Sequence, residues 1–260
     1  MEHISKAQVK MVRSLQQKKF RDELGLFVAE GEKCVEELRK AFTLELKIIN
    51  ERLISTEADA NTLLATPTEI EQMSGLRAPQ GVIGVFKKHR IEDWRLKNED
   101  LILALDGIQD PGNLGTIIRT CDWFGVHDII CSKDTADCYN PKVVQATMGA
   151  LARVRVHYVD LPEWLKQFTI HNAHFSIYGT LLEGCDMYEV LTSERMNELT
   201  NEGGAIIVMG NEGNGISQEV RKLVTDPIRI PSYPKEKASD TIESLNVSIA
   251  TAIVLAEFRR

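Results

Sequence analysis

The stretch from Leu101 to Gly125 reads LILALDGIQDPGNLGTIIRTCDWFG and predicts a strand, a turn and a helix in succession. The apolar run Leu101–Leu105 is typical of a strand covered on both faces of a sheet. Pro111 and Gly112 interrupt the run, and apolar side chains then recur at helical spacing over residues 114–124. A strand followed by a helix is the repeating unit of a parallel α/β sheet, where ligands bind near the carboxyl ends of the strands.

The same alternation continues toward the C-terminus and predicts one α/β domain over residues 100–260. Further strands are expected at 127–131, 175–178 and 205–209, and further helices at 141–151 and 216–224. The last helix, residues 245–258, is apolar almost all round, so it needs cover on most sides from a core or from a second subunit.

The N-terminal part predicts a smaller mixed α/β domain over residues 1–90. We expect strands at 26–29, 44–49 and 81–86, and helices at 4–16, 32–40 and 59–64. A further helix should start near Thr68, whose spacing to Glu71 fits a capping box. The charged stretch KKHRIEDWRLKNE, residues 87–99, lacks a strand pattern, and the linker between the domains is placed at 91–99.

The composition is that of an ordinary globular protein of 260 residues, with 43% hydrophobic and 27% charged residues. No apolar run approaches the roughly 20 residues that a membrane span requires. The N-terminus lacks the apolar core of a secretory signal, so we expect a cytoplasmic location. The five cysteines form no CxxC pair, and His171 and His174 have no third ligand nearby in sequence, so no metal is expected.

A basic stretch near the N-terminus is the one compositional sign of RNA binding in a chain of net charge −7. Such a stretch can contact phosphates, although a solvated helix face is an equal alternative. The six candidate RNA-binding residues are Lys6, Lys10, Arg13, Lys18, Lys19 and Arg21.

Three loops follow predicted strands and carry polar residues that could form a site. The first contains Asn113, which could simply cap the helix, and Arg119, a natural phosphate ligand on an otherwise apolar segment. The second, Gly210–Gly215, is glycine-rich but matches neither a Walker loop nor a dinucleotide fingerprint. The third contains Ile230 and Pro231 and, after a gap, the helix start Ser244–Ser248.

Together the three loops resemble the motifs of the SpoU (TrmH-like) family of RNA 2′-O-ribose methyltransferases, within the SPOUT class. Residues 140–150 resemble the helix that the family carries between its first two motifs, and residues 18–38 resemble its substrate-binding domain. The resemblance thus covers nearly the whole chain. The matching motif residues are Asn113 and Arg119; Gly210, Glu212, Gly213 and Gly215; and Ile230, Pro231, Ser244–Ser248 and Ala250.

The resemblance implies a fold and a partner that composition could not predict. It implies a C-terminal parallel-sheet domain with a deep trefoil knot, preceded by a ribosomal-protein-like α/β domain that binds the substrate. It further implies S-adenosylmethionine as the methyl donor, bound in the knot, and a homodimer formed through the C-terminal domain. Residues 232–243 depart from the pattern, because this loop is longer than is usual for the family.

The resemblance also implies roles for individual residues. It places Arg119 at the ribose hydroxyl, where the family's arginine is discussed as the base. Because a guanidinium stays protonated, we expect Arg119 instead to clamp the adjacent phosphate and the developing alkoxide. Asn113 would orient the ribose or Arg119, and Glu212 would hold the second loop or reach Arg119 of a partner subunit. Ser244 and Asn246 would organise the site. The expected donor-binding residues are Thr180, Gly210, Asn211, Gly213, Gly215, Ile230 and Leu245.

Two other functions remain open on sequence alone. One is base methylation by another SPOUT relative, and the other is a non-catalytic RNA-binding factor in ribosome assembly with the same fold. The sequence also leaves open whether the substrate is transfer RNA or ribosomal RNA, and which group takes the hydroxyl proton.

Overall fold

A computed structural model describes residues 1–53, 61–89, 101–195, 199, 203–233 and 244–260. No helix among them is long and apolar enough to cross a membrane. The chain forms two compact units. Unit 1 comprises Met1–Asp93 and Asp137–Arg153, and unit 2 comprises Trp94–Ala136 and Val154–Arg260. Unit 1 therefore includes a segment that the sequence places inside the C-terminal domain.

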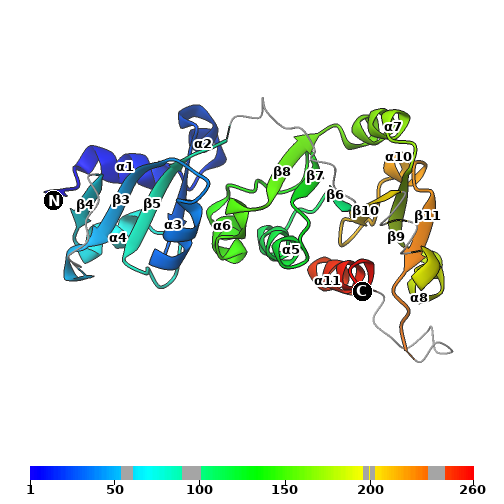
Figure 1. Ribbon diagram of the computed structural model, residues 1–260. Helices are drawn as coiled ribbons and strands as arrows, with labels where there is room; N and C mark the ends of the chain where they lie inside the picture. The colour runs from blue at the N-terminus through cyan, green and yellow to red at the C-terminus, as the bar shows by residue number, and fades with distance from the viewer. Residues whose placement is uncertain (54–60, 90–100, 196–198, 200–202, 234–243) are drawn as a thin grey trace. The chain divides into compact units, whose positions relative to one another are not determined.

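Unit 1 contains a five-stranded mixed sheet of order β1-β4-β3-β5-β2. Its strands β4, β3 and β5 are labelled side by side in Figure 1. Strands β1 and β3 run parallel to β4, whereas β5 is antiparallel to both β3 and β2. The strands are β1 (Glu2–His3), β2 (Leu26–Glu30), β3 (Leu44–Asn50), β4 (Thr62–Ala65) and β5 (Val82–Lys87). The helices are α1 (Lys6–Ser14), α2 (Lys18–Leu24), α3 (Glu32–Leu38), α4 (Pro67–Met73) and α6 (Pro141–Thr147), with 3₁₀ turns η1 (Glu51–Leu53) and η3 (Ala150–Ala152).

Alternating side chains of β2 and β5 separate the core of unit 1 into two layers. Val28 and Val85 belong to a cluster with residues of α1 and α4. Phe27 and Phe86 stack on each other with ring centroids 5.6 Å apart, and Phe27 also lies 4.8 Å from the ring of Tyr139. The segment 137–153 thus supplies part of the aromatic layer of unit 1.

Two predictions for unit 1 were wrong. Residues 62–64 were expected in a helix but belong to β4, because pairing with β1 and β3 decides the state of a short apolar run. The helix expected near Thr68 does begin there, at Pro67, but its capping box is not formed by Thr68 and Glu71. Thr66 caps it, accepting a hydrogen bond from the Glu69 amide while the Glu69 carboxylate accepts from the Thr66 amide. The predicted linker, 91–99, lies outside the described residues.

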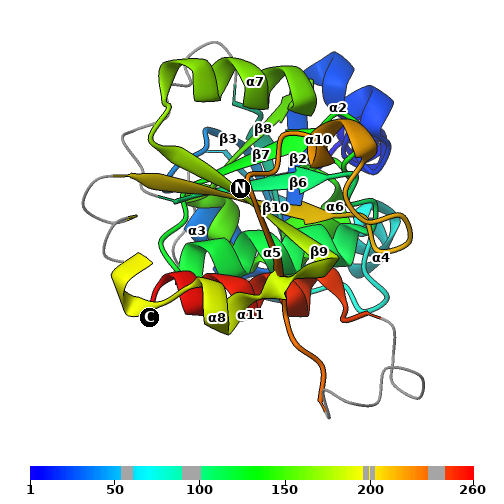
Figure 2. The same ribbon diagram turned by 90° about the vertical axis from the view of Figure 1, so that its right-hand side faces the viewer.

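Unit 2 contains a six-stranded sheet of order β11-β9-β10-β6-β7-β8 in which every pair is parallel, as predicted. Figure 2 shows α7 and α10 on one side of this sheet and α5 and α11 on the other. The strands are β6 (Leu101–Asp106), β7 (Asp128–Ser132), β8 (Arg155–Val159), β9 (Phe175–Asp186), β10 (Gly204–Gly210) and β11 (Asp226–Arg229). The helices are α5 (Pro111–Trp123), α7 (Leu161–His171), α8 (Met187–Val190), α10 (Gln218–Arg221) and α11 (Val247–Phe258).

Local interactions move several helix boundaries from their predicted positions. Helix α5 begins at Pro111 because Asp110 caps it, so Asn113 lies in the first turn and is not the cap. The helix expected over 141–151 is divided, because Met148 and Gly149 adopt φ angles of 52° and 90°. The helix expected over 216–224 is reduced to the four residues of α10.

The centre of the unit 2 sheet places two of the predicted loops side by side. Strands β6 and β10 are neighbours, and Gly210 pairs with Asp106 where both strands end. From β6 the sheet continues through β7 and β8 on one side, and from β10 it continues through β9 and β11 on the other. Such a switch in strand order opens a crevice at the carboxyl ends, where ligands bind in open α/β sheets.

Candidate active site at the ends of β6 and β10

Asn113 connects the three predicted motifs through its side-chain amide. Its Nδ2 donates a hydrogen bond to Glu212 Oε1 over 2.6 Å. Its Oδ1 accepts one from Asn246 Nδ2 over 2.9 Å. These three residues lie 99 and 133 positions apart in the chain, so the fold of unit 2 brings them together. We call them the Asn113–Glu212–Asn246 cluster.

Asn246 is also the N-cap of α11, which fixes the direction of its amide. Its Oδ1 accepts hydrogen bonds from the Ser248 amide over 3.0 Å and from the Ser248 hydroxyl over 2.6 Å. Its Nδ2 is therefore left to face Asn113. Ser244 and Leu245 precede the cap and are exposed, with Leu245 at 51%. The structure thus places Asn246, but not Ser244, in the cluster.

The glycine-rich loop is closed by Asn211. Its backbone exchanges two hydrogen bonds with Gly215, over 3.0 and 2.9 Å. Its Oδ1 accepts from the amides of Gly213 and Asn214, and its Nδ2 donates to the Gly107 carbonyl over 2.7 Å. The Asn211 side chain is therefore engaged within the protein, and it connects the loop after β10 to the end of β6.

A glycine is required at position 210 for this loop to close. A Cβ atom there would lie 2.3 Å from the Gly215 carbonyl carbon, which is backbone and cannot move aside independently. Gly215 itself has a φ of 67°, a region that favours glycine. The two glycines therefore shape the loop, and the Asn211 side chain holds the exposed Gly213 through its amide.

Two residues that were not predicted from the sequence, Asp106 and Ser132, connect the loops around this cluster by hydrogen bonds. The buried Asp106 accepts a hydrogen bond from the Ser217 amide over 2.7 Å. Ser132 Oγ accepts from the Gly107 amide over 2.8 Å and donates to Asp134. The sequence could have indicated both residues, because Asp106 and Ser132 are polar residues at the carboxyl ends of buried apolar strands. The loops after β6, β7 and β10 consequently form one hydrogen-bonded layer.

Three further positions expected to bind the methyl donor, Thr180, Ile230 and Leu245, lie outside the glycine-rich loop. Thr180 donates its hydroxyl to the Val208 carbonyl over 3.0 Å, and Ile230 follows the end of β11 half-buried. Ile230 and Leu245 offer apolar side chains beside backbone that belongs to no helix or strand. Backbone donors and acceptors next to apolar cover suit an adenosine, so these residues fit S-adenosylmethionine. Of the long loop, only Ser232 and Tyr233 lie among the described residues.

Arg119 stands apart from the cluster. It follows Asn113 by six residues, which places it about 240° further round α5. Arg119 is exposed and makes no hydrogen bond or ion pair with any residue that the structure describes. Its neighbours on this face are Thr116 and Trp123, the latter 85% exposed. The guanidinium donors are thus open to a ligand, while the structure does not bring them to Asn113.

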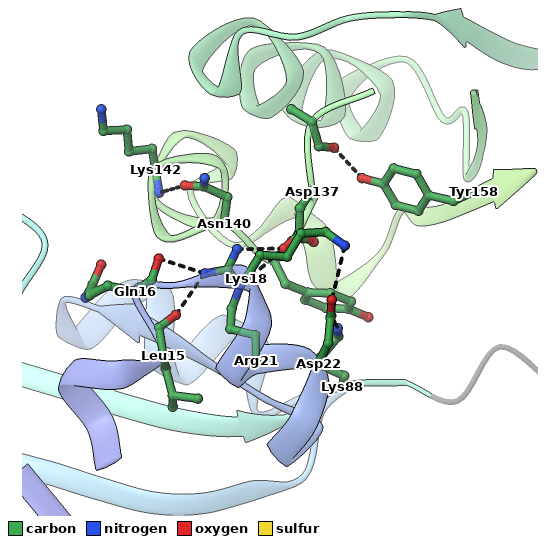
Figure 3. Close-up of polar contacts among 12 residues, drawn as sticks. Leu15, Gln16, Lys18, Arg21, Asp22, Lys88, Asp137, Asn140, Lys142 and Tyr158 are labelled. Carbon is green, nitrogen blue, oxygen red and sulfur yellow. Dashed lines mark hydrogen bonds and ion pairs between the residues drawn. The ribbon is translucent and has the colours of Figure 1, made fainter. Parts of the chain in front are cut away.

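The basic residues of unit 1 divide into an exposed set and one buried member. Five are exposed on α1 and α2: Lys6, Lys10, Arg13, Lys18 and Lys19. Arg21 is only 1% exposed, and its Nη2 lies 2.7 Å from Asp137 Oδ2 (Figure 3). We therefore assign Arg21 to the structure of unit 1 and not to an RNA surface.

The fold and the geometry define an α/β protein whose candidate ligand site lies at the centre of a parallel sheet. Its polar groups are amides, one carboxylate and glycine backbone. Residues 100–256 match the SpoU rRNA Methylase family, and residues 6–84 match the MRM3-like substrate binding domain. This chain belongs to the SpoU rRNA methylase family.

Full-length relatives share both parts of the chain. The 23S rRNA (guanosine(2553)-2′-O)-methyltransferase RlmP of Bacillus subtilis is 27% identical over 263 residues, covering 100% of this chain and 98% of that protein. The 23S rRNA (guanosine-2′-O-)-methyltransferase RlmB of Neisseria meningitidis is 33% identical over 243 residues, covering 90% and 86%.

Solved structures show the same architecture. An RNA methyltransferase of the TrmH family from Porphyromonas gingivalis has a TM-score of 0.82 and 36% identity, with 98% of each chain covered. An AdoMet-bound rRNA methyltransferase from Sinorhizobium meliloti has a TM-score of 0.79 and 27% identity, covering 100% of this chain and 96% of that one.

Proposed function

We propose that this protein transfers a methyl group from S-adenosylmethionine to a ribose 2′-hydroxyl of ribosomal RNA. The observation that carries the proposal is the Asn113–Glu212–Asn246 cluster, which joins the three family motifs by hydrogen bonds. Ribosomal RNA is chosen over transfer RNA because relatives that match unit 1 as well as unit 2 are named for 23S rRNA. The family and the proposed substrate agree with a cytoplasmic location.

S-adenosylmethionine supplies an electrophilic methyl group on a sulfonium sulfur. The residues that would hold it are the loop Gly210–Gly215, Thr180, Ile230 and Leu245. The closed conformation of that loop is held by the protein itself, since Asn211 Oδ1 accepts from the amides of Gly213 and Asn214. Positioning the hydroxyl oxygen in line with the methyl group could supply about 7–11 kcal/mol of the barrier reduction.

Arg119 would bind the RNA at the reacting ribose. Its exposed guanidinium can hold a phosphate bidentately and stabilise charge that develops on the ribose oxygen. Because its pKa exceeds about 12, we assign proton acceptance to the phosphate or to water and not to Arg119. Asn113 has one Nδ2 hydrogen left after its bond to Glu212, and this donor would orient the ribose.

The knot and the homodimer are part of this proposal. The resemblance of the three motifs to the SpoU family implies the knot in the C-terminal part of unit 2. Exposed apolar side chains on α5 and α11 support pairing of two subunits. They include Trp123, at 85%, and Ile249, at 53%. Subunit pairing would also bring further residues to Arg119.

The test is methyl transfer to cellular RNA. The protein is incubated with S-adenosylmethionine labelled in its methyl group and with total RNA from cells that lack the protein. The RNA is then fractionated and digested to nucleosides. Label in a 2′-O-methylated nucleoside of ribosomal RNA is expected. Label on a base would identify a base methyltransferase, and the absence of label with retained RNA binding would favour a non-catalytic assembly factor.

A further inference from the structure

Unit 1 contains a buried arginine whose carboxylate partner comes from the middle of the methyltransferase sequence. Arg21 Nε and Nη2 both donate to Asp137 Oδ2, over 3.1 and 2.7 Å. Its Nη1 donates to the carbonyls of Leu15 and Gln16 over 2.8 and 2.9 Å (Figure 3). Among the described residues, Asp137 is the carboxylate that neutralises this guanidinium. We call the two residues the Arg21–Asp137 pair.

Asp137 is held tightly by this arrangement. A buried charge is strongly unfavourable unless a partner compensates it, and removing one partner of such a pair costs more than the pair itself contributes. The second oxygen of Asp137 accepts the Tyr139 amide over 3.0 Å. Both carboxylate oxygens are thus engaged, and the backbone at position 137 is fixed to α2.

The rest of the segment 137–153 is fixed to unit 1 as well. The Tyr139 ring packs on Phe27, and Arg153 Nη1 donates to Glu37 Oε2 over 2.8 Å. Gly149 has a φ of 90°, and a Cβ atom there would lie 2.6 Å from Glu37 Cβ. The absence of a side chain at Gly149 therefore lets the segment lie close against Glu37 of α3.

The residue before Asp137, Ala136, belongs to unit 2. It lies in the hydrogen-bonded layer formed by the loops after β6, β7 and β10. The Ala136 amide donates to the Ile108 carbonyl over 2.8 Å, and its carbonyl accepts the Tyr158 hydroxyl over 2.5 Å. One hydrogen bond of 3.1 Å joins the hydroxyl groups of Thr135 and Ser132. Ser132 in turn holds Gly107, whose carbonyl accepts from Asn211 in the glycine-rich loop.

We propose that the Arg21–Asp137 pair is a positioning pair. Through it, RNA binding by unit 1 would stabilise the donor-binding conformation of the glycine-rich loop Gly210–Gly215 in unit 2. The pair fixes one end of residues 132–137, and the other end shapes Gly107 and, through Asn211, the loop Gly210–Gly215. Both side chains are taken up by contacts within unit 1, so Asp137 would act through the loop as a positioning residue. The inference rests on the proposed function, since it assumes an RNA ligand for unit 1 and S-adenosylmethionine for unit 2.

The test measures how RNA changes the affinity for the donor product S-adenosylhomocysteine, which binds without reacting. Calorimetry is carried out with and without the ribosomal RNA fragment that the protein methylates. For the wild-type protein, RNA should tighten binding by about 5-fold or more, the lower end of usual coupling between sites. In Arg21→Met/Asp137→Leu, which removes both charges at similar volume, the ratio of affinities should fall to about 1.

Two further variants separate this coupling from general damage. Asp137→Glu keeps the charge but displaces the carboxylate, and it tests the proposal if the apolar pair does not fold. Lys87→Gln/Glu45→Gln removes an exposed ion pair of unit 1 and should keep the wild-type ratio. Hydrogen exchange gives a second readout, since RNA should protect residues 132–136 and 210–215 in the wild type and not in the Asp137 variants.

The outcomes distinguish this inference from the proposed function. A wild-type protein that methylates ribosomal RNA but shows no effect of RNA on S-adenosylhomocysteine affinity would overturn the inference alone. So would an undiminished ratio in folded Arg21→Met/Asp137→Leu or Asp137→Glu. A wild-type protein that binds neither S-adenosylhomocysteine nor RNA would instead overturn the proposed function, and the inference with it.

Discussion

At the scale of single residues, Glu212 matters through one hydrogen bond. Glutamine at this position can still accept from Asn113 through Oε1, whereas alanine cannot. We expect Glu212→Ala to lower kcat/KM by about 10- to 100-fold, because a hydrogen bond to a charged group contributes about 1.5–3 kcal/mol. Glu212→Gln should retain most of the activity. Steady-state methyl transfer checks both variants, and a glutamine variant as inactive as alanine would show that the charge itself is needed.

For Arg119 the property that matters is the planar guanidinium group, which can bind a phosphate through two hydrogen bonds. Arg119→Lys keeps the charge but loses bidentate binding, so we expect kcat/KM to fall at least about 10-fold while donor affinity stays unchanged. Single-turnover kinetics and calorimetry with S-adenosylhomocysteine provide the two measurements. Nearly full turnover by the lysine variant would contradict the clamp assigned to Arg119.

At the scale of elements, the paired strands β7 and β8 contain a buried charge cluster that predicts acid sensitivity. Burial alone raises the pKa of Asp128, but hydrogen bonds from Arg155 and His157 outweigh it and hold the pKa at about 2. Because this pKa is depressed on folding, the stabilisation is complete above the unfolded value of about 3.9 and is lost as pH falls toward 2. Urea unfolding of wild type and Asp128→Asn should therefore differ least near pH 2 and most above pH 5.

Helix α1 presents three bases at positions 6, 10 and 13, which lie on one exposed face. Neutralising all three to glutamine should weaken RNA binding and reduce the slope of log K against log salt by about 2. The matched control removes three bases elsewhere in unit 1, in Lys33→Gln/Lys40→Gln/Lys87→Gln. An equal loss in both triple variants would indicate net charge, and not α1, as the source of affinity.

The elements also show what the sequence could predict. Continuous apolar runs such as β6 and β10 identified the parallel sheet, and loop glycines marked the ends where the site lies. The edge strand β8 was missed because Arg155 and His157 interrupt its pattern, and they are tolerated there by Asp128. The role of Arg21 was not predictable either, because its partner Asp137 is 116 residues away.

At the scale of the whole molecule, the apolar surface of α5 and α11 is the proposed subunit interface. Charge placed there should prevent pairing, because a buried unpaired carboxylate is strongly unfavourable. We expect Trp123→Glu/Ile249→Glu to be monomeric by light scattering at concentrations where the wild type is dimeric. Ile170→Glu, on an exposed apolar position of α7, serves as the control and should leave the mass unchanged. A wild-type monomer would contradict the interface.

The inclusion of residues 137–153 in unit 1 has a consequence for the order in which the chain can fold as it is synthesised. Domains usually fold from the N-terminus as they leave the ribosome. Here the first 93 residues emerge with Arg21 lacking its carboxylate and the Phe27 layer lacking Tyr139. They must wait for about 60 more residues, which include β6, α5 and β7 of the other unit. Unit 1 can therefore be completed only after part of unit 2 has been synthesised. Dividing the chain between residues 93 and 101 would separate residues 137–153 from the rest of unit 1.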